Sequence, residues 1–126
     1  MAIEKATEKL KPGMTAELVR VVDDSLVVKH VGGDGVFSTP SMIGLMERAG
    51  IEAVQAHLPP GFTTVGFEVH VKHFAATPKG KTVKVRAELI AIDGRKLSFA
   101  VEAHDDERKV GAGTHRRAII EVKGKA

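Results

Sequence analysis

Residues 38–58, STPSMIGLMERAGIEAVQAHL, form the stretch that decides the fold. Their apolar side chains recur at three- and four-residue steps, the period of an amphipathic helix. Ser38 or Thr39 can supply the N-cap oxygen, and Pro40 suits the first helical position, where its missing N–H costs nothing. Pro59-Pro60-Gly61 ends the pattern. We therefore expect one long, mostly apolar helix, with Met42, Leu45, Met46, Ala49, Ala53 and Ala56 along its apolar face.

Two glycines, Gly44 and Gly50, interrupt this helical pattern. Glycine inside a helix normally costs about 1 kcal/mol relative to alanine. Either another backbone passes close to the helix at these positions, or the helix simply tolerates them.

The chain after the helix alternates between apolar and polar residues, as strands do. In residues 62–76, the valines at 65, 69 and 71 and Phe67 share one face, which puts His73 on that apolar face. Residues 81–92 lead through the Asp93-Gly94 hairpin signal into residues 97–103, and a turn at 105–107 leads into residues 109–122. These connections are too short for parallel crossovers, so the strands are expected to be antiparallel.

The chain before the helix carries weaker signals. Residues 14–31 are typical of two short strands about a turn at Asp23-Asp24-Ser25, and the glycines of residues 32–35 then break regular structure. The flanks 1–13 and 123–126 are expected to be loosely held. One helix and five or six antiparallel strands predict an α+β hotdog fold, in which the sheet wraps the helix, within a single domain spanning residues 1–126.

Composition narrows the function. The chain has 126 residues, no Cys, only 4% aromatic residues, and a net charge of +3 from 19 basic and 16 acidic side chains. Scarce aromatic side chains argue against nucleic-acid binding, and the mild positive charge suits an anionic small ligand. The six His lack the spacing of a metal site, and the sequence has neither a GxGxxG motif nor a Walker loop, so we expect neither metal nor cofactor. No stretch is apolar enough to cross a membrane, and we expect a cytoplasmic protein.

Three polar residues stand out as candidates for chemistry: Thr39 at the helix start, Glu47 about two turns later, and His73 on an apolar strand face. Individually they suit an N-cap, a solvated helix residue and a core histidine. Thr39 and Glu47 are about 12 Å apart along the helix. A histidine between them can hydrogen-bond to a carboxylate and to a hydroxyl or water, as acid–base catalysis requires.

The segments 37–47 (FSTPSMIGLME), 70–105 and 111–120 (GAGTHRRAII) resemble the fluoroacetyl-CoA thioesterase family of the hotdog superfamily. The resemblance includes the HFAATP element at 73–78. It implies that Thr39, Glu47 and His73 are catalytic. It also places Gly66 beside the substrate carbonyl and Arg117 near the acyl end of the site, and it implies a dimer with active sites at its interface.

One departure from the family concerns specificity. The aromatic lid segment before the catalytic Thr is replaced here by residues 32–35, although Phe37 is retained as a candidate substrate-binding residue. We therefore expect hydrolysis of a small acyl-CoA without strict selectivity for fluoroacetyl-CoA, by a homodimer or a tetramer.

Two other functions compete with hydrolysis. A non-catalytic binding module for acyl-CoA or another lipophilic ligand is the main alternative. An enoyl-CoA hydratase needs an Asp/His loop that the sequence does not contain.

Overall fold

The central helix α2 (Thr39–Val54) is the axis of the computed structural model, which describes residues 3–122. Ser38 caps it by accepting a hydrogen bond from the Ser41 N–H at 3.1 Å, and Pro40 lies in its first turn, so the predicted start is confirmed. A 3₁₀ turn, η2 (Gln55–His57), continues it to the predicted end. No helix within residues 3–122 is long and apolar enough to cross a membrane.

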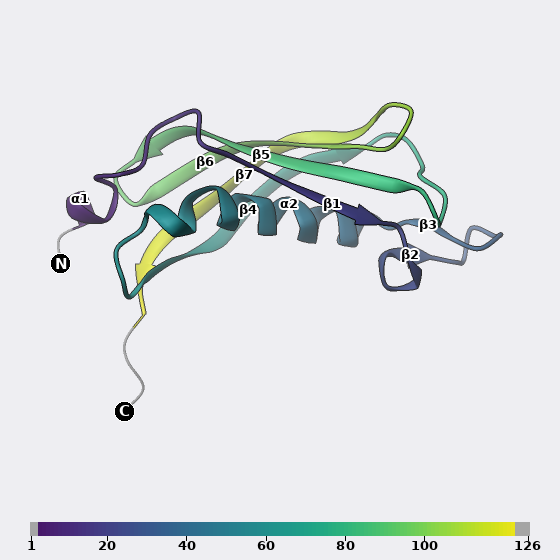
Figure 1. Cartoon of the computed structure of the whole chain (residues 1–126), viewed down its shortest axis with the longest axis horizontal. Helices are drawn as coiled ribbons and strands as arrows, with labels where there is room; N and C mark the ends of the chain where they lie inside the picture. The colour runs from purple at the N-terminus through teal and green to yellow at the C-terminus, as the bar shows by residue number, and fades with distance from the viewer. Residues whose placement is uncertain (1–2, 123–126) are drawn as a thin grey trace.

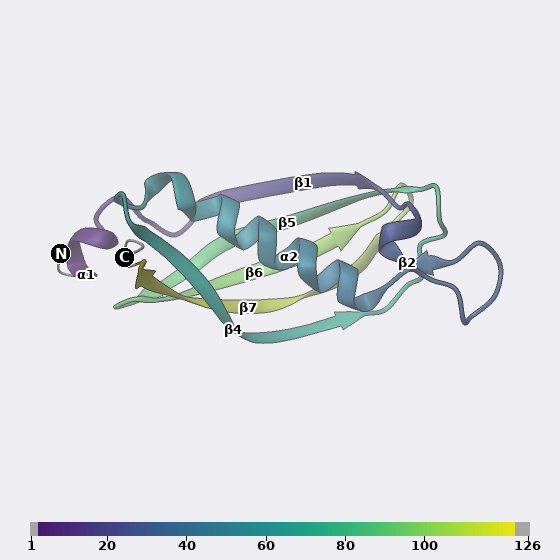
Figure 2. The same cartoon turned by 90° about the horizontal axis from the view of Figure 1, so that it is seen from below.

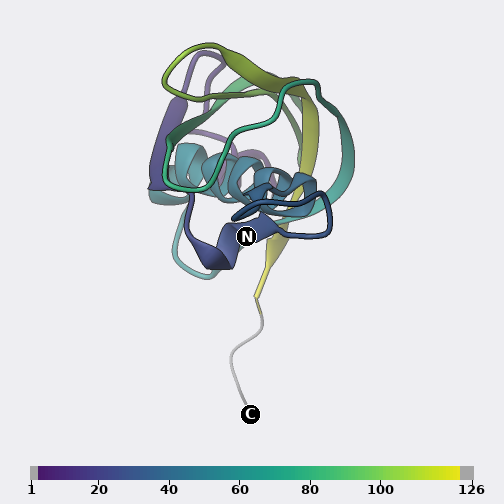
Figure 3. The ribbon, with the colours of Figure 1, turned by 90° about the vertical axis from the view of Figure 1, so that its right-hand side faces the viewer.

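A five-stranded antiparallel sheet wraps this helix (Figure 1). Its strands are β1 (Thr15–Val21), β4 (Phe62–His73), β5 (Thr82–Asp93), β6 (Lys96–His104) and β7 (Lys109–Glu121). Their order in the sheet is β1-β5-β6-β7-β4, so β1 and β4 form the two edges. The strands β5, β6 and β7 form the expected meander, with the Asp93-Gly94 turn between the first two. Figure 2 shows α2 lying across one face of the sheet, and Figure 3 shows the sheet curving around it. The predicted α+β arrangement of helix and wrapping sheet is confirmed.

The core lies between α2 and the concave face of the sheet. Met42, Met46 and Ala49 of the helix are fully buried there against inward-facing side chains of the strands, among them Val85 and Phe99.

The prediction that residues 1–13 are loosely held is wrong for the described part of that flank. A short helix, α1 (Ile3–Ala6), and the residues after it place Ala6 and Leu10 in the core. Both side chains are apolar, and their burial holds this flank against the domain. Residues 123–126 lie outside the described part.

The region before α2 agrees only in part with the prediction. The first expected strand is β1, but the second is reduced to β2 (Val27–Val28), which follows a 3₁₀ turn, η1 (Asp24–Leu26). β2 pairs with β3 (Val36–Phe37) in a separate two-stranded sheet. The loop between them carries Gly32, Gly33 and Gly35 at positive φ, where other residues are strained. This small sheet delivers Phe37 to the start of α2.

A bulge in β4 changes which of its side chains face the helix. The pairing with β7 shifts between Gly66 and Glu68, so Phe67 is an extra residue on β4. Thr64 and Gly66 face the helix before the bulge, whereas Val69, Val71 and His73 lie opposite helix-facing positions of β7 after it. The single face predicted for residues 65, 67, 69 and 71 is therefore wrong, because alternation cannot reveal a one-residue insertion. His73 does lie on the helix side.

The close backbone approach considered for the helix glycines is absent within residues 3–122. A Cβ on Gly44 would meet no atom within 4 Å, and one on Gly50 would meet only side chains at ordinary contact distance. Among the described glycines, Gly113 of β7 is the most tightly packed against backbone: a Cβ there would overlap the His70 carbonyl oxygen and lie 2.6 Å from Val71 Cα.

Gly113→Ala and Gly44→Ala should therefore have opposite effects on stability. We expect Gly113→Ala to lower the free energy of unfolding by at least about 2 kcal/mol, because the β4–β7 backbone must move. Gly44→Ala should raise it by about 0.5–1 kcal/mol, because alanine favours the helix. Urea denaturation of both variants measures the difference, and equal effects of the two substitutions would contradict the packing described here.

Candidate active site

Thr39 and His73 meet at the start of α2. The Thr39 hydroxyl lies 2.8 Å from His73 Nδ1. Their meeting follows from the antiparallel course of α2 and β4: Gln55, just after α2, hydrogen-bonds to Phe62 and Thr63 at the start of β4. The beginning of the helix is therefore next to the end of the strand. The two predicted residues are brought together as expected.

The imidazole of His73 is held by few contacts. Phe37 packs edge-on against it, with 5.9 Å between ring centroids. His73 Nε2 is buried and has no hydrogen-bond partner among residues 3–122. Burial lowers the pKa of His73 below its usual 6.5, and the Ala75 backbone opposes this only in part. His73 is therefore a neutral base at pH 7 that can accept the proton of the Thr39 hydroxyl.

A surface hollow opens beside this pair. Its walls come from the small β2–β3 sheet, the start of α2 and the segment after β4. Phe37 lines it, as the sequence predicts for a substrate-binding residue. The glycine loop 32–35 follows the β2 side of this hollow and carries no aromatic side chain. The hollow is lined by Val28, His30, Val31, Val36, Phe37, Ser38, Thr39, His73, Phe74, Ala75 and Ala76.

Glu47 lies with Gly66 and Arg117, away from His73. A Cβ built on Gly66 would lie 3.1 Å from Glu47 Oε2 and 3.0 Å from Arg117 Nη1. These three residues also line one open hollow beside β4. Within the described chain, no hydrogen bond joins Glu47 to His73. The Glu47 carboxylate lies at Gly66 and Arg117, so Glu47 does not orient His73 within the described residues of one chain. Its role toward His73 stays a prediction for the assembled protein.

Arg117 is almost completely buried, with 4% of its surface exposed. Its Nε donates to the Thr64 hydroxyl at 2.7 Å, its Nη2 donates to the Thr64 carbonyl oxygen at 2.9 Å, and its Nη1 lies 3.1 Å from His115 Nε2. Burial lowers the pKa of Arg117, and Glu47 partly offsets this. The guanidinium remains charged, since the unperturbed pKa of arginine lies far above neutral pH.

Sequence reasoning missed His115, the partner of Arg117. It is 1% exposed and stacks on Phe99, with ring centroids 6.2 Å apart. The alternation of the strand could have revealed it. His115, Arg117 and Ile119 lie two residues apart, so all three side chains point to the same, core-facing side of β7. Two polar residues on a buried strand face require partners there.

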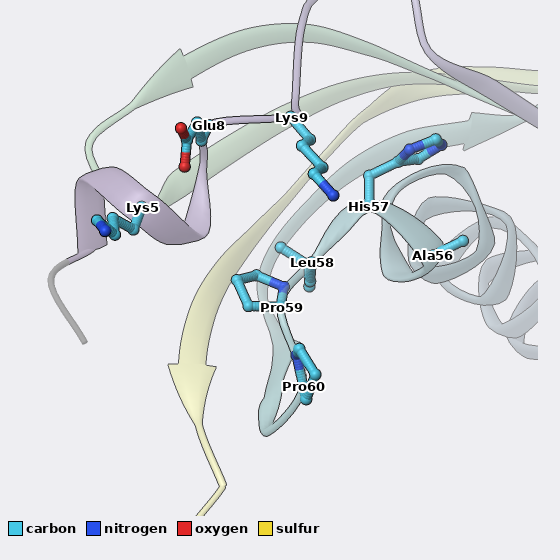
Figure 4. Close-up of a pocket in the computed structure, with 8 residues that line it drawn as sticks. All are labelled: Lys5, Glu8, Lys9, Ala56, His57, Leu58, Pro59 and Pro60. Atoms are coloured by element: carbon cyan, nitrogen blue, oxygen red, sulfur yellow. The ribbon is translucent and has the colours of Figure 1, made fainter.

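A further hollow lies at the opposite end of α2 (Figure 4). It is formed by the N-terminal segment and the loop after η2, with Lys5, Lys9 and His57 among its residues. None of the predicted site residues lines it. Across residues 3–122, no group of three His, Asp or Glu side chains is arranged to hold a metal ion.

Comparison of the sequence with known proteins points to fluoroacetyl-CoA thioesterases, both in the matching family and in a similar single protein. The model of the family described as fluoroacetyl-CoA-specific thioesterase matches residues 14–123. A fluoroacetyl-CoA thioesterase from Streptantibioticus cattleyicolor is 48% identical over 88 residues, which cover 70% of this chain and 63% of that relative. The alignment thus spans less than two thirds of the relative's length.

Solved structures show the same fold. The fluoroacetyl-CoA thioesterase FlK is 39% identical, with a TM-score of 0.82 and 90% of both chains covered. A hot-dog-like protein from Thermanaerovibrio acidaminovorans has a TM-score of 0.82 at 22% identity, covering 91% of this chain and 87% of its own. The second likeness concerns the fold alone.

The burial of His73 predicts its titration. In Glu47→Gln, which removes the carboxylate that a second chain could bring to His73, the pKa of His73 should lie below 6.5 because burial disfavours the imidazolium, and His73 should be neutral throughout pH 7–8. NMR titration of the histidine ring protons measures this, with His73→Ala identifying the signal. A pKa above 6.5 would show that a carboxylate or another acceptor outweighs burial in the assembled protein.

Proposed function

The chain belongs to the fluoroacetyl-CoA-specific thioesterase family and has its hotdog fold, and on this premise we propose that it hydrolyses the thioester of a small acyl-CoA. The observation that carries the proposal is the 2.8 Å contact between Thr39 and the neutral base His73, beside a hollow at a helix start. Hydrolysis needs a nucleophile, a base and stabilisation of an oxyanion, and this end of the molecule offers all three.

The proposed reaction begins with transfer of a proton to His73 Nδ1. The donor is the Thr39 hydroxyl or a water molecule in its place, and the new bond forms between that oxygen and the thioester carbon. The positive end of the α2 dipole favours the resulting oxyanion. The C–S bond then breaks, and the coenzyme A sulfur takes up the proton. When Thr39 is the nucleophile, a water that gives its proton to His73 then attacks the Thr39 ester, the bond to the Thr39 oxygen breaks, and that oxygen takes the proton back. Either route consumes one water overall and gives the free acid and coenzyme A, with no cofactor beyond the substrate.

The proposed enzyme is a homodimer joined along β4. This edge strand has 12 residues and leaves Val65, Phe67 and Val69 between 36% and 46% exposed. A long apolar edge strand invites pairing with another strand. Antiparallel pairing of β4 with its counterpart, about a two-fold axis through His70 and with Phe67 as the extra residue, would place Val65 opposite Phe74, which is also exposed.

The same pairing brings the two halves of the site together. It would place His73 opposite Gly66 of the partner subunit, and therefore beside Glu47 of the partner subunit. When His73 Nδ1 accepts from Thr39, Nε2 carries the ring hydrogen, and this N–H is buried without an acceptor in the part of the chain that the structure describes. A carboxylate supplied across the interface would satisfy this donor and stabilise the imidazolium that forms. Gly66 and Arg117 of the partner subunit would then border the acyl group.

The open hollow beside Thr39 accounts for the proposed breadth of substrate. The glycine loop 32–35 contains no aromatic residue, and Phe37 is the one aromatic residue between it and Thr39. Acetyl and other small acyl groups therefore meet no closed lid. Since acyl-CoA esters are made and used inside cells, we also propose that the enzyme works in the cytoplasm.

His73→Ala should lower kcat/KM by about two to four orders of magnitude on every acyl-CoA that the parent hydrolyses, the usual contribution of a positioned general base. His57→Ala, at the far hollow, is the matched control and should hydrolyse normally. Thiol release across acyl-CoA esters of graded length measures both. Normal turnover by His73→Ala would remove His73 from the mechanism. A parent that binds acyl-CoA without hydrolysing it would favour the alternative of a binding module.

The open site also predicts weak selectivity. The kcat/KM for fluoroacetyl-CoA should not exceed that for acetyl-CoA by several orders of magnitude, because no aromatic lid is present to discriminate between the two acyl groups. Parallel kinetics on the two esters measure this ratio. Discrimination against acetyl-CoA by several orders of magnitude would show that other side chains provide the selectivity.

A further inference from the structure

His115 is a buried titratable residue that the proposed mechanism does not use. It lies on β7 within a closed set of contacts: Phe99 of β6 covers one ring face, and its Cδ2 lies 3.5 Å from where a Cβ on Gly50 of α2 would be. The Glu68 carbonyl oxygen of β4 lies 2.9 Å from its Nδ1. Its Nε2 lies 3.1 Å from Arg117 Nη1.

The two polar contacts assign the tautomer of His115. A carbonyl oxygen can only accept a hydrogen bond, so His115 Nδ1 carries the hydrogen and donates to Glu68. A guanidinium can only donate, so His115 Nε2 is unprotonated and accepts from Arg117 Nη1. One imidazole can satisfy both contacts only in its neutral form with the hydrogen on Nδ1.

We propose that His115 is a positioning residue, which accepts one hydrogen of Arg117 Nη1 and thereby holds the guanidinium at the space over Gly66. This inference rests on the proposed function, in which that space borders the acyl group. Thr64 takes the Nε and Nη2 hydrogens, so Nη1 is the end of the guanidinium that faces Gly66. His115 is the hydrogen-bond acceptor that the described structure gives to Nη1.

The charges around His115 favour its neutral form. Arg117 faces it from β7 and Glu47 from α2; β4 presents the Glu68 carbonyl, while the Glu68 carboxylate pairs with Arg116 and His70. Burial lowers the pKa of His115 most strongly, Arg117 lowers it further, and the Glu68 carbonyl and Glu47 oppose these effects. A protonated His115 would turn an N–H toward the Arg117 N–H and break the contact.

Two substitutions separate the contacts of His115. In His115→Gln, the side-chain oxygen can reach the Nε2 position and still accept from Arg117. In His115→Asn, the shorter amide can reach the Nδ1 position and still donate to Glu68, but it leaves Arg117 Nη1 without its acceptor. We expect His115→Asn to lose about 10- to 100-fold in kcat/KM, the effect of misplacing a group near the reacting centre, and His115→Gln to retain most of the activity.

Both variants must be folded during the assay, so their Tm is measured first and activity is assayed about 10 °C or more below it. A merely structural role predicts that both variants lose activity alike, because each loses one hydrogen bond. Equal losses in Asn and Gln would therefore overturn the proposal.

NMR gives a readout that does not depend on turnover. The ¹⁵N spectrum of the parent at pH 7 should show His115 protonated at Nδ1 alone, and the Arg117 Nη1 protons should exchange slowly in the parent and in His115→Gln but rapidly in His115→Asn. Protonation at Nε2, or fast exchange in the parent, would overturn the positioning role. Slow exchange in a parent that hydrolyses no acyl-CoA would support the positioning of Arg117 while removing the proposed function.

Discussion

Burial of the apolar face of α2 in the concave side of the sheet is the constraint on which the rest of the structure depends. A helix that carries Met42, Met46 and Ala49 on its inner face must be covered, and one curved sheet covers it along its length. Only the turn η2 and a short loop separate the helix from β4, so the strand returns antiparallel to the helix. This return brings the last residue of β4 to the first turn of α2 and creates the Thr39–His73 contact.

Much of this arrangement could be predicted from the sequence because its signals are local. Periodicity and the Ser38-Thr39-Pro40 start define α2, and Asp93-Gly94 defines the β5–β6 hairpin. The bulge at Phe67, the tertiary contacts of Ala6 and the shortness of β2 could not be predicted, since each depends on what packs against it. The contact of Thr39 with His73 was predictable from topology together with family resemblance. The separation of Glu47 from His73 was not, because side-chain spacing along a helix does not say where the neighbouring strand ends.

The division of the candidate residues is informative about assembly. Thr39, His73 and Phe37 surround one hollow, while Glu47, Gly66, His115 and Arg117 gather at another place along β4. His73 Nε2 lacks an acceptor among residues 3–122 of its own chain, and the edge of β4 carries exposed apolar side chains. A buried donor without an acceptor costs about 1–3 kcal/mol, so a carboxylate arriving with a second copy would be favourable. In the proposed dimer, one pairing of two β4 strands would supply both the missing edge partner and the missing acceptor.

Subunit complementation tests this two-chain site most directly. The variants Glu47→Gln and His73→Ala are each assayed alone and then after unfolding and refolding as an equimolar mixture. In a mixed dimer, His73 of one chain meets the intact Glu47 of the other, which restores one of the two sites. Because about half of the refolded dimers are mixed, the mixture should recover about a quarter of the parent's specific activity. A mixture whose activity stays at the average of the two variants would show that Glu47 and His73 do not act together across the interface.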